Sequence, residues 1–122
     1  MNSLPSSIAI LGPGGIGGFL AAVFWKAGYE VTCVAKSERA KDINQNGIQL
    51  QSDLFGLFIA RPRAVTSLDT DPRILFITTK AVELSDALAR IDPLMLRKTV
   101  VIPLLNGIEH IGVLRKYFVH YV

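Results

Sequence analysis

Three glycines near the N-terminus constrain the fold more than any other feature of the sequence. Gly12, Gly14 and Gly17 directly follow an apolar run at residues 7–11 and precede a segment with helical apolar spacing at residues 19–27. A short apolar run bounded by glycine is typical of a buried parallel strand. Between such a strand and a helix, Gly-x-Gly-x-x-Gly is the dinucleotide-binding fingerprint, because it lets a pyrophosphate rest on the helix N-terminus. A glycine-rich turn without a ligand is the simpler alternative.

The rest of the chain predicts strands that alternate with helices. We expect strands at residues 7–11, 31–35, 73–78 and 99–104, and helices at residues 19–27, 38–44, 82–91 and 108–118. Gly28 is expected to end the first helix and Ser37 to cap the second. Two short extended segments, 48–51 and 57–60, indicate an antiparallel excursion near residues 48–63. The alternation predicts an α/β fold: a Rossmann-type, three-layer, doubly wound and mainly parallel sheet.

Composition and charge exclude several other classes of protein. The net charge is +3, and the basic residues are scattered rather than interleaved with aromatic residues as on a nucleic-acid-binding surface. Cys33 is the one cysteine and stands in an apolar run, so we interpret it as a core residue. His110 and His120 form no cluster that indicates a metal. Since residues 1–7 do not resemble a signal peptide and no apolar run is long enough for a membrane helix, we expect a cytoplasmic protein without metal, nucleic-acid or membrane partners.

The end of the second strand indicates which dinucleotide would bind. Dinucleotide-binding domains that prefer NAD have an acidic residue there, which accepts a hydrogen bond from the ribose 2′-hydroxyl. This sequence has Lys36 and Ser37, with Arg39 nearby. A cation and a hydroxyl suit a 2′-phosphate, which favours NADP(H). If the strand ends two residues later, Glu38 takes the acidic position and NAD is favoured instead.

Two further polar residues follow later strands. Lys80 comes after the strand expected at 73–78, and Asn106 after the strand expected at 99–104. Ligands of open α/β sheets bind beyond the carboxyl ends of the strands, so both residues are expected at the edge that holds the glycine turn. Lys80 would hold cofactor or an anionic substrate, and Asn106 would orient substrate or nicotinamide. Taken singly, they read more simply as a solvated lysine and an Asn-Gly turn.

In combination these motifs resemble the ketopantoate reductase (2-dehydropantoate 2-reductase) family. The resemblance covers about residues 7–118 and rests on the glycine motif, the basic residue Lys36, and the runs Thr78-Thr79-Lys80-Ala81 and Leu105-Asn106-Gly107. It implies reduction of ketopantoate, a small 2-oxo acid, to pantoate by NADPH on the route to pantothenate. The family usually has arginine where Lys36 stands, and lysine cannot grip a phosphate bidentately.

The motifs and the resemblance together assign the expected binding residues. The cofactor-binding set is Gly12, Pro13, Gly14, Gly15, Ile16, Gly17, Lys36, Ser37, Thr79, Lys80 and Asn106. Lys80 and Asn106 are also the expected substrate-binding residues. The resemblance implies that the lysine acting as general acid belongs to a second, helical domain, so no catalytic residue is expected in this chain.

We expect residues 1–122 to be one dinucleotide-binding domain, truncated and without the C-terminal helical domain. Such a fragment would bind cofactor without ordinary turnover. One alternative is the cofactor domain of another 2-hydroxy-acid or hydroxyisobutyrate-type dehydrogenase. A second is a non-catalytic nucleotide-binding or redox-sensing module, whose apolar tail at residues 117–122 would pair with another chain, which makes a homo-oligomer one expected assembly.

Overall fold

The computed structural model describes residues 7–104 of the 122-residue chain. The strands are β1 Ser7–Leu11, β2 Glu30–Val34, β3 Ile48–Ser52, β4 Gly56–Ala60, β5 Arg63–Val65, β6 Ile74–Ile77 and β7 Val100–Pro103. The helices are α1 Gly15–Lys26, α2 Ser37–Asn46 and α3 Leu84–Leu88, with 3-10 turns η1 Ala81–Glu83 and η2 Pro93–Leu96. The helix expected at 108–118 lies outside the described residues.

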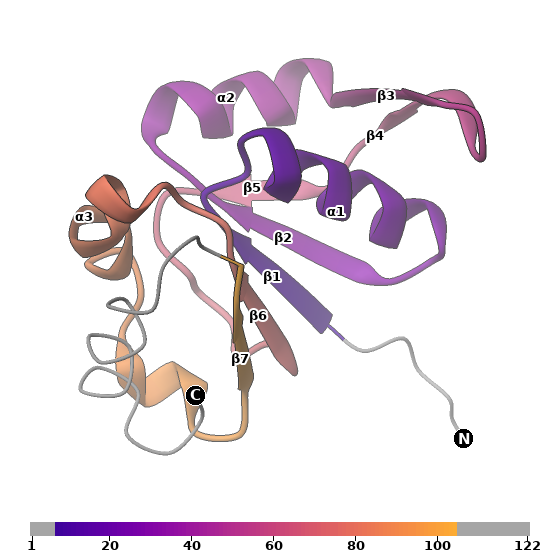
Figure 1. Ribbon diagram of the computed structural model, residues 1–122. Helices are drawn as coiled ribbons and strands as arrows, with labels where there is room; N and C mark the ends of the chain where they lie inside the picture. The colour runs from indigo at the N-terminus through magenta and orange to yellow at the C-terminus, as the bar shows by residue number, and fades with distance from the viewer. Residues whose placement is uncertain (1–6, 105–122) are drawn as a thin grey trace.

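Five parallel strands form the main sheet, in the order β5-β2-β1-β6-β7 (Figure 1). β1 is central, and its Ile10 lies opposite Cys33 of β2 on one side and Phe76 of β6 on the other. From β1 the chain moves to β2 and β5 in one direction and later returns to β6 and β7 in the other. The direction of winding therefore reverses beside β1, where ligands of doubly wound folds bind.

Helices cover both faces of this sheet. Ile8 and Ile10 of β1 belong to a buried cluster with Ala21 of α1 and Ile43 of α2. Their neighbours in the strand point to the other face, where Leu11 is buried in a separate cluster that includes residues of α3. Figure 1 shows α1 and α2 together above the sheet and α3 apart from them. The predicted Rossmann-type, three-layer architecture is confirmed.

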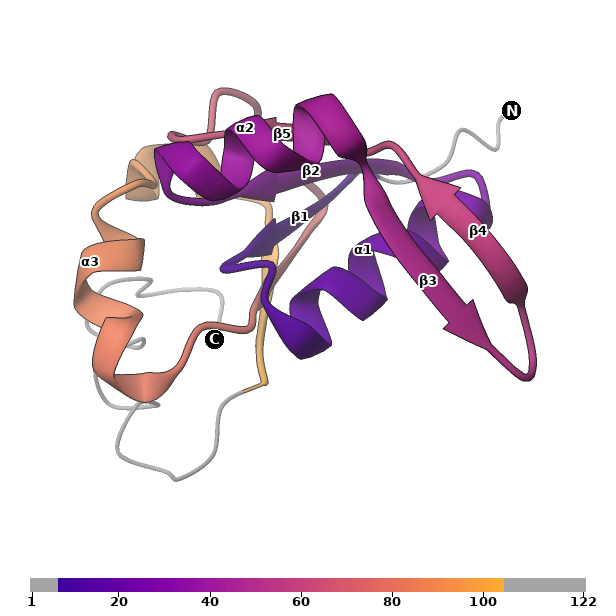
Figure 2. The same cartoon turned by 90° about the horizontal axis from the view of Figure 1, so that it is seen from above.

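The antiparallel excursion is also confirmed, although the parallel strand that follows it was not predicted. β3 and β4 form a hairpin in which Ile48 pairs with Ala60, and Figure 2 shows it extending beyond the end of α2. The excursion ends at Ala60, because Arg63 already belongs to β5, which pairs in parallel with β2. The Asn44 side chain of α2 fixes β5 through two hydrogen bonds to the backbone of Ala64, at 2.9 and 3.0 Å.

The ends of α1 differ in how well the sequence predicted them. The helix begins at Gly15 rather than at residue 19, so its first turn contains glycines despite their poor helix propensity, and of these Gly17 packs closely against β1 and the end of β6. Gly28 does end the helix, with a φ of +97°. The Gly28 N–H donates to the Trp25 carbonyl and the Tyr29 N–H to the Phe24 carbonyl, at 3.0 and 3.1 Å, which is the Schellman pattern.

Two other helix predictions are wrong in detail. Ser37 does not cap α2: the extended residue before the helix is Lys36, with φ −62° and ψ 157°, so Ser37 is already in the first turn. The helix expected at 82–91 is divided into η1 and α3 and ends at Leu88. The chain then turns into η2, where the Asp92 side chain accepts a hydrogen bond from the Leu94 N–H at 3.0 Å.

Candidate functional site

A cleft of about 270 Å³ lies at the carboxyl ends of β1, β2 and β6. This is the edge at which the sequence placed the site. The lining residues come from the segments after these three strands and from α3: Leu11, Gly12, Pro13, Gly14, Gly15, Val34, Ala35, Lys36, Arg39, Thr78, Thr79, Lys80, Glu83, Asp86, Ala87 and Arg90. Ile16, Gly17 and Ser37 are not among them, and Asn106 lies outside the described residues.

The glycines of the motif have separate structural roles. Gly12 has a φ of +78°, and a Cβ there would overlap the Thr79 side chain. A Cβ on Gly17 would overlap the Thr78 hydroxyl and approach the Gly12 carbonyl oxygen to 2.9 Å, so Gly17 sets how closely α1 packs on β1 and β6. A Cβ on Gly14 or Gly15 would meet no atom within 4 Å. Both residues line the cleft, so the space at these two positions is available to a ligand.

The N-terminus of α1 opens at the same place. Its N-cap residue is Gly14, no side chain caps it, and its first turn has no acidic residue. The first N–H groups of a helix have no partner within the helix and carry partial positive charge. A twelve-residue helix with an uncapped N-terminus beside an open cleft is suited to hold an anion.

Lys36, at the end of β2, lies at the rim of the cleft. Its side chain is 68% exposed, and its Nζ is 3.8 Å from the Glu83 Oε2. Because β2 ends at Val34, Glu38 lies in the first turn of α2 and not in the position that the alternative with NAD required. Glu38 is exposed and is not among the lining residues.

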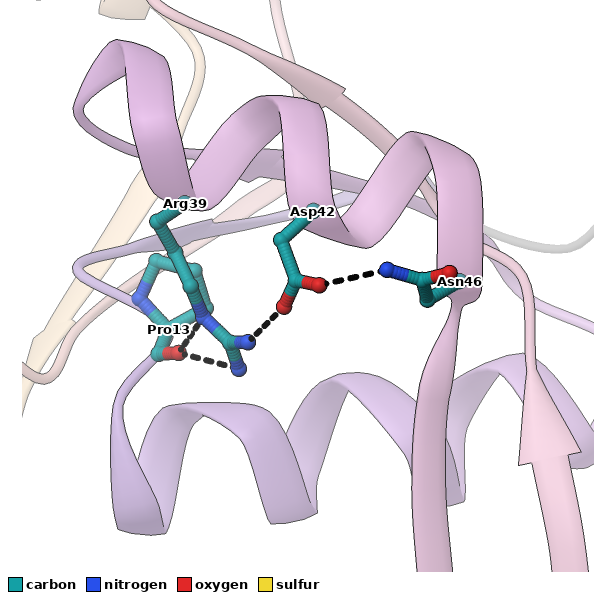
Figure 3. A network of polar contacts seen from close by, with 4 residues as sticks. All are labelled: Pro13, Arg39, Asp42 and Asn46. Carbon is teal, nitrogen blue, oxygen red and sulfur yellow. Dashed lines mark hydrogen bonds and ion pairs between the residues drawn. The ribbon is translucent and has the colours of Figure 1, made fainter.

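Arg39 is a lining residue that the sequence placed only near the site. Its Nε and Nη2 donate to the Pro13 carbonyl oxygen at 3.1 and 3.0 Å, and its Nη1 donates to Asp42 at 3.0 Å. Figure 3 shows how Asp42 also accepts a hydrogen bond from Asn46, so that α2 holds the glycine loop through one connected network. The sequence spacing could have indicated Arg39 as a residue of the site, because Arg39 lies one helical turn after Lys36.

The segment after β6 forms the opposite wall. The Thr78 hydroxyl lies 2.8 Å from the Gly12 carbonyl oxygen, to which it donates, and so ties β6 to the glycine loop. The Thr79 Oγ1 is buried and has no hydrogen-bond partner. Lys80 is exposed and lines the cleft. A buried hydroxyl without a partner is costly, so a ligand or a water molecule that reached the Thr79 hydroxyl would remove that cost.

Charge around the cleft is mixed, with an excess of cations. Four basic side chains, Lys36, Arg39, Lys80 and Arg90, line it together with two acidic ones, Glu83 and Asp86. This excess favours an anionic ligand.

Other kinds of site find no support in the described part of the chain. Burial raises the pKa of the Cys33 thiol to about 12, which supports the interpretation of Cys33 as an inert core residue. Within residues 7–104, no three His, Cys, Asp or Glu side chains are grouped so that they could hold a metal ion. Over the same residues, no helix combines the length and apolar character needed to cross a bilayer.

A dinucleotide fits the residues that are present. The open space at Gly14 admits the close approach of a pyrophosphate, and the uncapped N-terminus of α1 offers backbone donors to it. The hydroxyl of Thr79 and the basic side chains supply further donors to an anionic ligand.

Comparison with known proteins agrees with this geometry. Residues 8–122 match the family model of ketopantoate reductase PanE/ApbA. A 2-dehydropantoate 2-reductase from Lactococcus lactis is 34% identical, over 90% of this chain and 36% of that protein. The chain spans about a third of the length of the curated relatives it matches.

Several solved structures are similar over about nine tenths of this chain, and two of them illustrate the range. A PanE/ApbA family ketopantoate reductase from Ralstonia eutropha superimposes with a TM-score of 0.80 at 22% identity, over 90% of this chain and 37% of the other. A D-mandelate dehydrogenase with NADH and anilino(oxo)acetate has a TM-score of 0.77 at 25% identity, over 91% of this chain and 37% of the other. Because the family model matches nearly the whole length of this chain, the chain belongs to the ketopantoate reductase PanE/ApbA family, whose members are NAD(P)-dependent oxidoreductases.

Proposed function

We propose that this chain is the NADP(H)-binding domain of an enzyme that reduces a 2-oxo acid, with ketopantoate as the substrate. The observation that carries the proposal is the convergence, in one cleft, of the open glycine loop, an uncapped helix N-terminus and the basic side chains Lys36, Arg39 and Lys80. In this proposal residues 1–122 are one dinucleotide-binding domain.

In this proposal, different residues of the cleft contact different parts of the cofactor. Gly14 and the first N–H groups of α1 hold the pyrophosphate, because a side chain at Gly14 would fill the space it needs. Lys36, at the rim, meets the 2′-phosphate. Lys80, on the opposite wall, holds a phosphate of the cofactor or the carboxylate of the substrate, and Thr79 donates its free hydroxyl to the ligand.

When bound, NADPH supplies the hydride that reduces the 2-oxo group of the substrate. The chain itself binds and orients the cofactor at the carboxyl edge of the sheet. The general acid is proposed to lie in a part of the enzyme that corresponds to the portion of the relatives not matched by this chain. We therefore expect cofactor binding, and no ordinary turnover with ketopantoate, from these 122 residues alone.

The end of β2 supports NADP(H) over NAD(H). The strand ends at Val34, so that Lys36, and not Glu38, stands at the position that meets the 2′-substituent of the ribose. An ammonium beside that substituent attracts a phosphate. Arg39, one helical turn later, adds a second positive charge to the same wall.

The proposal is tested by titrating NADPH and NADH against the chain, with the fluorescence of the reduced nicotinamide as the signal. Tighter binding of NADPH is expected, because Lys36 adds a charge-assisted contact to the 2′-phosphate. Lys36→Gln should weaken the binding of NADPH by about tenfold and leave the binding of NADH nearly unchanged. Lys41→Gln is the matched control, because it removes the same charge from an exposed position of the helix α2, which follows Lys36, and lies outside the cleft. Equal affinities for both cofactors, unaffected by Lys36→Gln, would remove the assignment of NADP(H).

A second candidate is the cofactor domain of a dehydrogenase that uses NADH and a different 2-oxo acid. The D-mandelate dehydrogenase with a similar fold supports it, since that structure holds NADH. The carboxylate of Glu83, which lies against Lys36 in the cleft, is the feature of this chain that favours it. Tighter binding of NADH than of NADPH in the same titration would select this candidate.

A further inference from the structure

The ion pair between Lys36 and Glu83 crosses the cleft. Lys36 follows β2 and Glu83 belongs to η1, which follows β6, and these two strands lie on opposite sides of β1. The Lys36 Nζ and the Glu83 Oε2 are 3.8 Å apart, and both residues line the cleft. The carboxylate therefore occupies one side of the ammonium group that is proposed to meet the 2′-phosphate.

The backbone fixes the position from which Glu83 reaches Lys36. The Glu83 N–H donates to the Lys80 carbonyl at 2.9 Å, closing the short η1 turn that begins after Lys80. The residue before this turn and the last residue of the turn thus supply a cation and an anion of the cleft wall. Within residues 7–104, the structure gives Lys36 no ion-pair partner other than Glu83.

We propose that Glu83 determines how strongly the site prefers NADPH to NADH, because its carboxylate competes with the 2′-phosphate for Lys36. This inference rests on the proposed function. A 2′-phosphate has to displace the carboxylate from Lys36 before it can contact the ammonium group. A 2′-hydroxyl does not compete for that contact. Glu83 thus lowers the affinity for NADPH and leaves the affinity for NADH nearly unaffected.

The pair is solvated, so the size of the effect is limited. The side chains of Lys36 and Glu83 are 68% and 46% exposed. Exposed ion pairs of this kind correspond to a change of up to about fivefold in an equilibrium constant. Glu83→Gln is therefore expected to tighten the binding of NADPH by about two- to fivefold at low salt. This gain in affinity should shrink as salt screens the charges.

The test measures the affinities of the 122-residue chain for NADPH and for NADH by calorimetry, at low and at high salt. Four variants are compared with the unmodified chain: Glu83→Gln, Asp86→Asn, Lys36→Gln and the double variant Lys36→Gln/Glu83→Gln. Asp86→Asn is the matched control, because it removes the same charge from the same cleft at a residue that forms no ion pair with Lys36 within the described part of the chain.

The proposal expects three results. Glu83→Gln raises the affinity for NADPH and the ratio of the two affinities. Asp86→Asn leaves that ratio within a factor of two. Adding Glu83→Gln to Lys36→Gln changes the ratio no further, because the competition acts through Lys36.

Other results overturn it. An unchanged or weaker affinity of the Glu83→Gln variant for NADPH shows that no competition exists. A higher ratio that arises only from loss of NADH affinity shows that Glu83 holds the ribose hydroxyl instead. A gain that persists without Lys36 shows that Glu83 acts on the phosphate directly. If the unmodified chain binds neither cofactor, the proposed function fails as well, whereas ordinary NADPH binding with no response to Glu83→Gln overturns this inference alone.

Discussion

Gly17 in the first turn of α1 provides the sharpest test of how the glycine motif holds the fold together. A Cβ at Gly17 would overlap the Thr78 hydroxyl, lie 2.9 Å from the Gly12 carbonyl oxygen and lie 3.1 Å from the Cγ2 of Ile10. Two of these neighbours belong to the backbone or to a fully buried strand residue, which cannot move away at low cost. The Gly17→Ala variant must therefore shift α1 or displace Thr78.

Each of these responses destabilises the folded state. Overpacking of a buried position costs about 1–3 kcal/mol. Displacing Thr78 also breaks the hydrogen bond from its hydroxyl to the Gly12 carbonyl, which is worth about 1 kcal/mol. The better helix propensity of alanine offsets up to about 1 kcal/mol of this. We expect a net loss of about 1–3 kcal/mol in the free energy of unfolding.

Urea denaturation, followed by the fluorescence of Trp25, measures this loss. Trp25 is the one tryptophan and lies near the end of the same helix. Gly18→Ala is the matched control, because a Cβ there would only reach the Arg39 Nη2 at 3.6 Å and the Pro13 carbonyl oxygen at 3.8 Å, which are ordinary contacts. The Gly18→Ala variant should be as stable as the unmodified chain or slightly more stable. Equal stability of the two variants would refute the argument from packing.

Three further predictions concern the cleft and the core. Gly14→Ala should change the free energy of unfolding by less than about 0.5 kcal/mol, since no atom lies within 4 Å of the added Cβ. The same variant should weaken the binding of NADPH by about tenfold or more in the fluorescence titration, because the added methyl group occupies space that the ligand needs. Arg39→Gln should cost about 1 kcal/mol in urea denaturation, because it removes the donors to the Pro13 carbonyl, whereas an unchanged midpoint would show that the loop holds its own conformation. Burial raises the pKa of Cys33 from 9.0 to about 12, so the unfolded chain loses this proton first as the pH rises. Relative to Cys33→Ala, stability should stay constant below pH 9 and fall by about 1.4 kcal/mol per pH unit from there toward pH 12, and parallel urea curves of the two proteins over that range would contradict it.

The fold was largely predictable because its signals are local. Short apolar runs predicted the parallel strands β1, β2, β6 and β7, and the glycine spacing predicted the turn between β1 and α1. β5 was missed because it has only three residues, Arg63–Val65, and no pattern of its own. What makes it a strand is pairing with β2 and the hydrogen bonds of Asn44 to Ala64, contacts that join residues far apart in the sequence.

The candidate site was predictable at the level of strand ends and not at the level of side-chain partners. Parallel strands bring their carboxyl ends to one edge, so Gly14, Lys36 and Lys80 could be placed together. That Arg39 binds the Pro13 carbonyl, or that Glu83 reaches Lys36, depends on where long side chains extend in three dimensions. No spacing in the sequence specifies those distances.

These side-chain partners determine how binding energy is distributed over the cleft. Arg39 already donates to Pro13 and Asp42, and Lys36 already lies against Glu83, so an anionic ligand gains from each only the difference between two partners. The first N–H groups of α1 and the Thr79 hydroxyl have no protein partner to give up within the described residues. A ligand contact with these groups removes the cost of an unsatisfied donor. In the proposed function, the affinity for the pyrophosphate would therefore arise mainly from the glycine loop and its helix, whereas the basic side chains, with their existing partners, would adjust which dinucleotide is preferred.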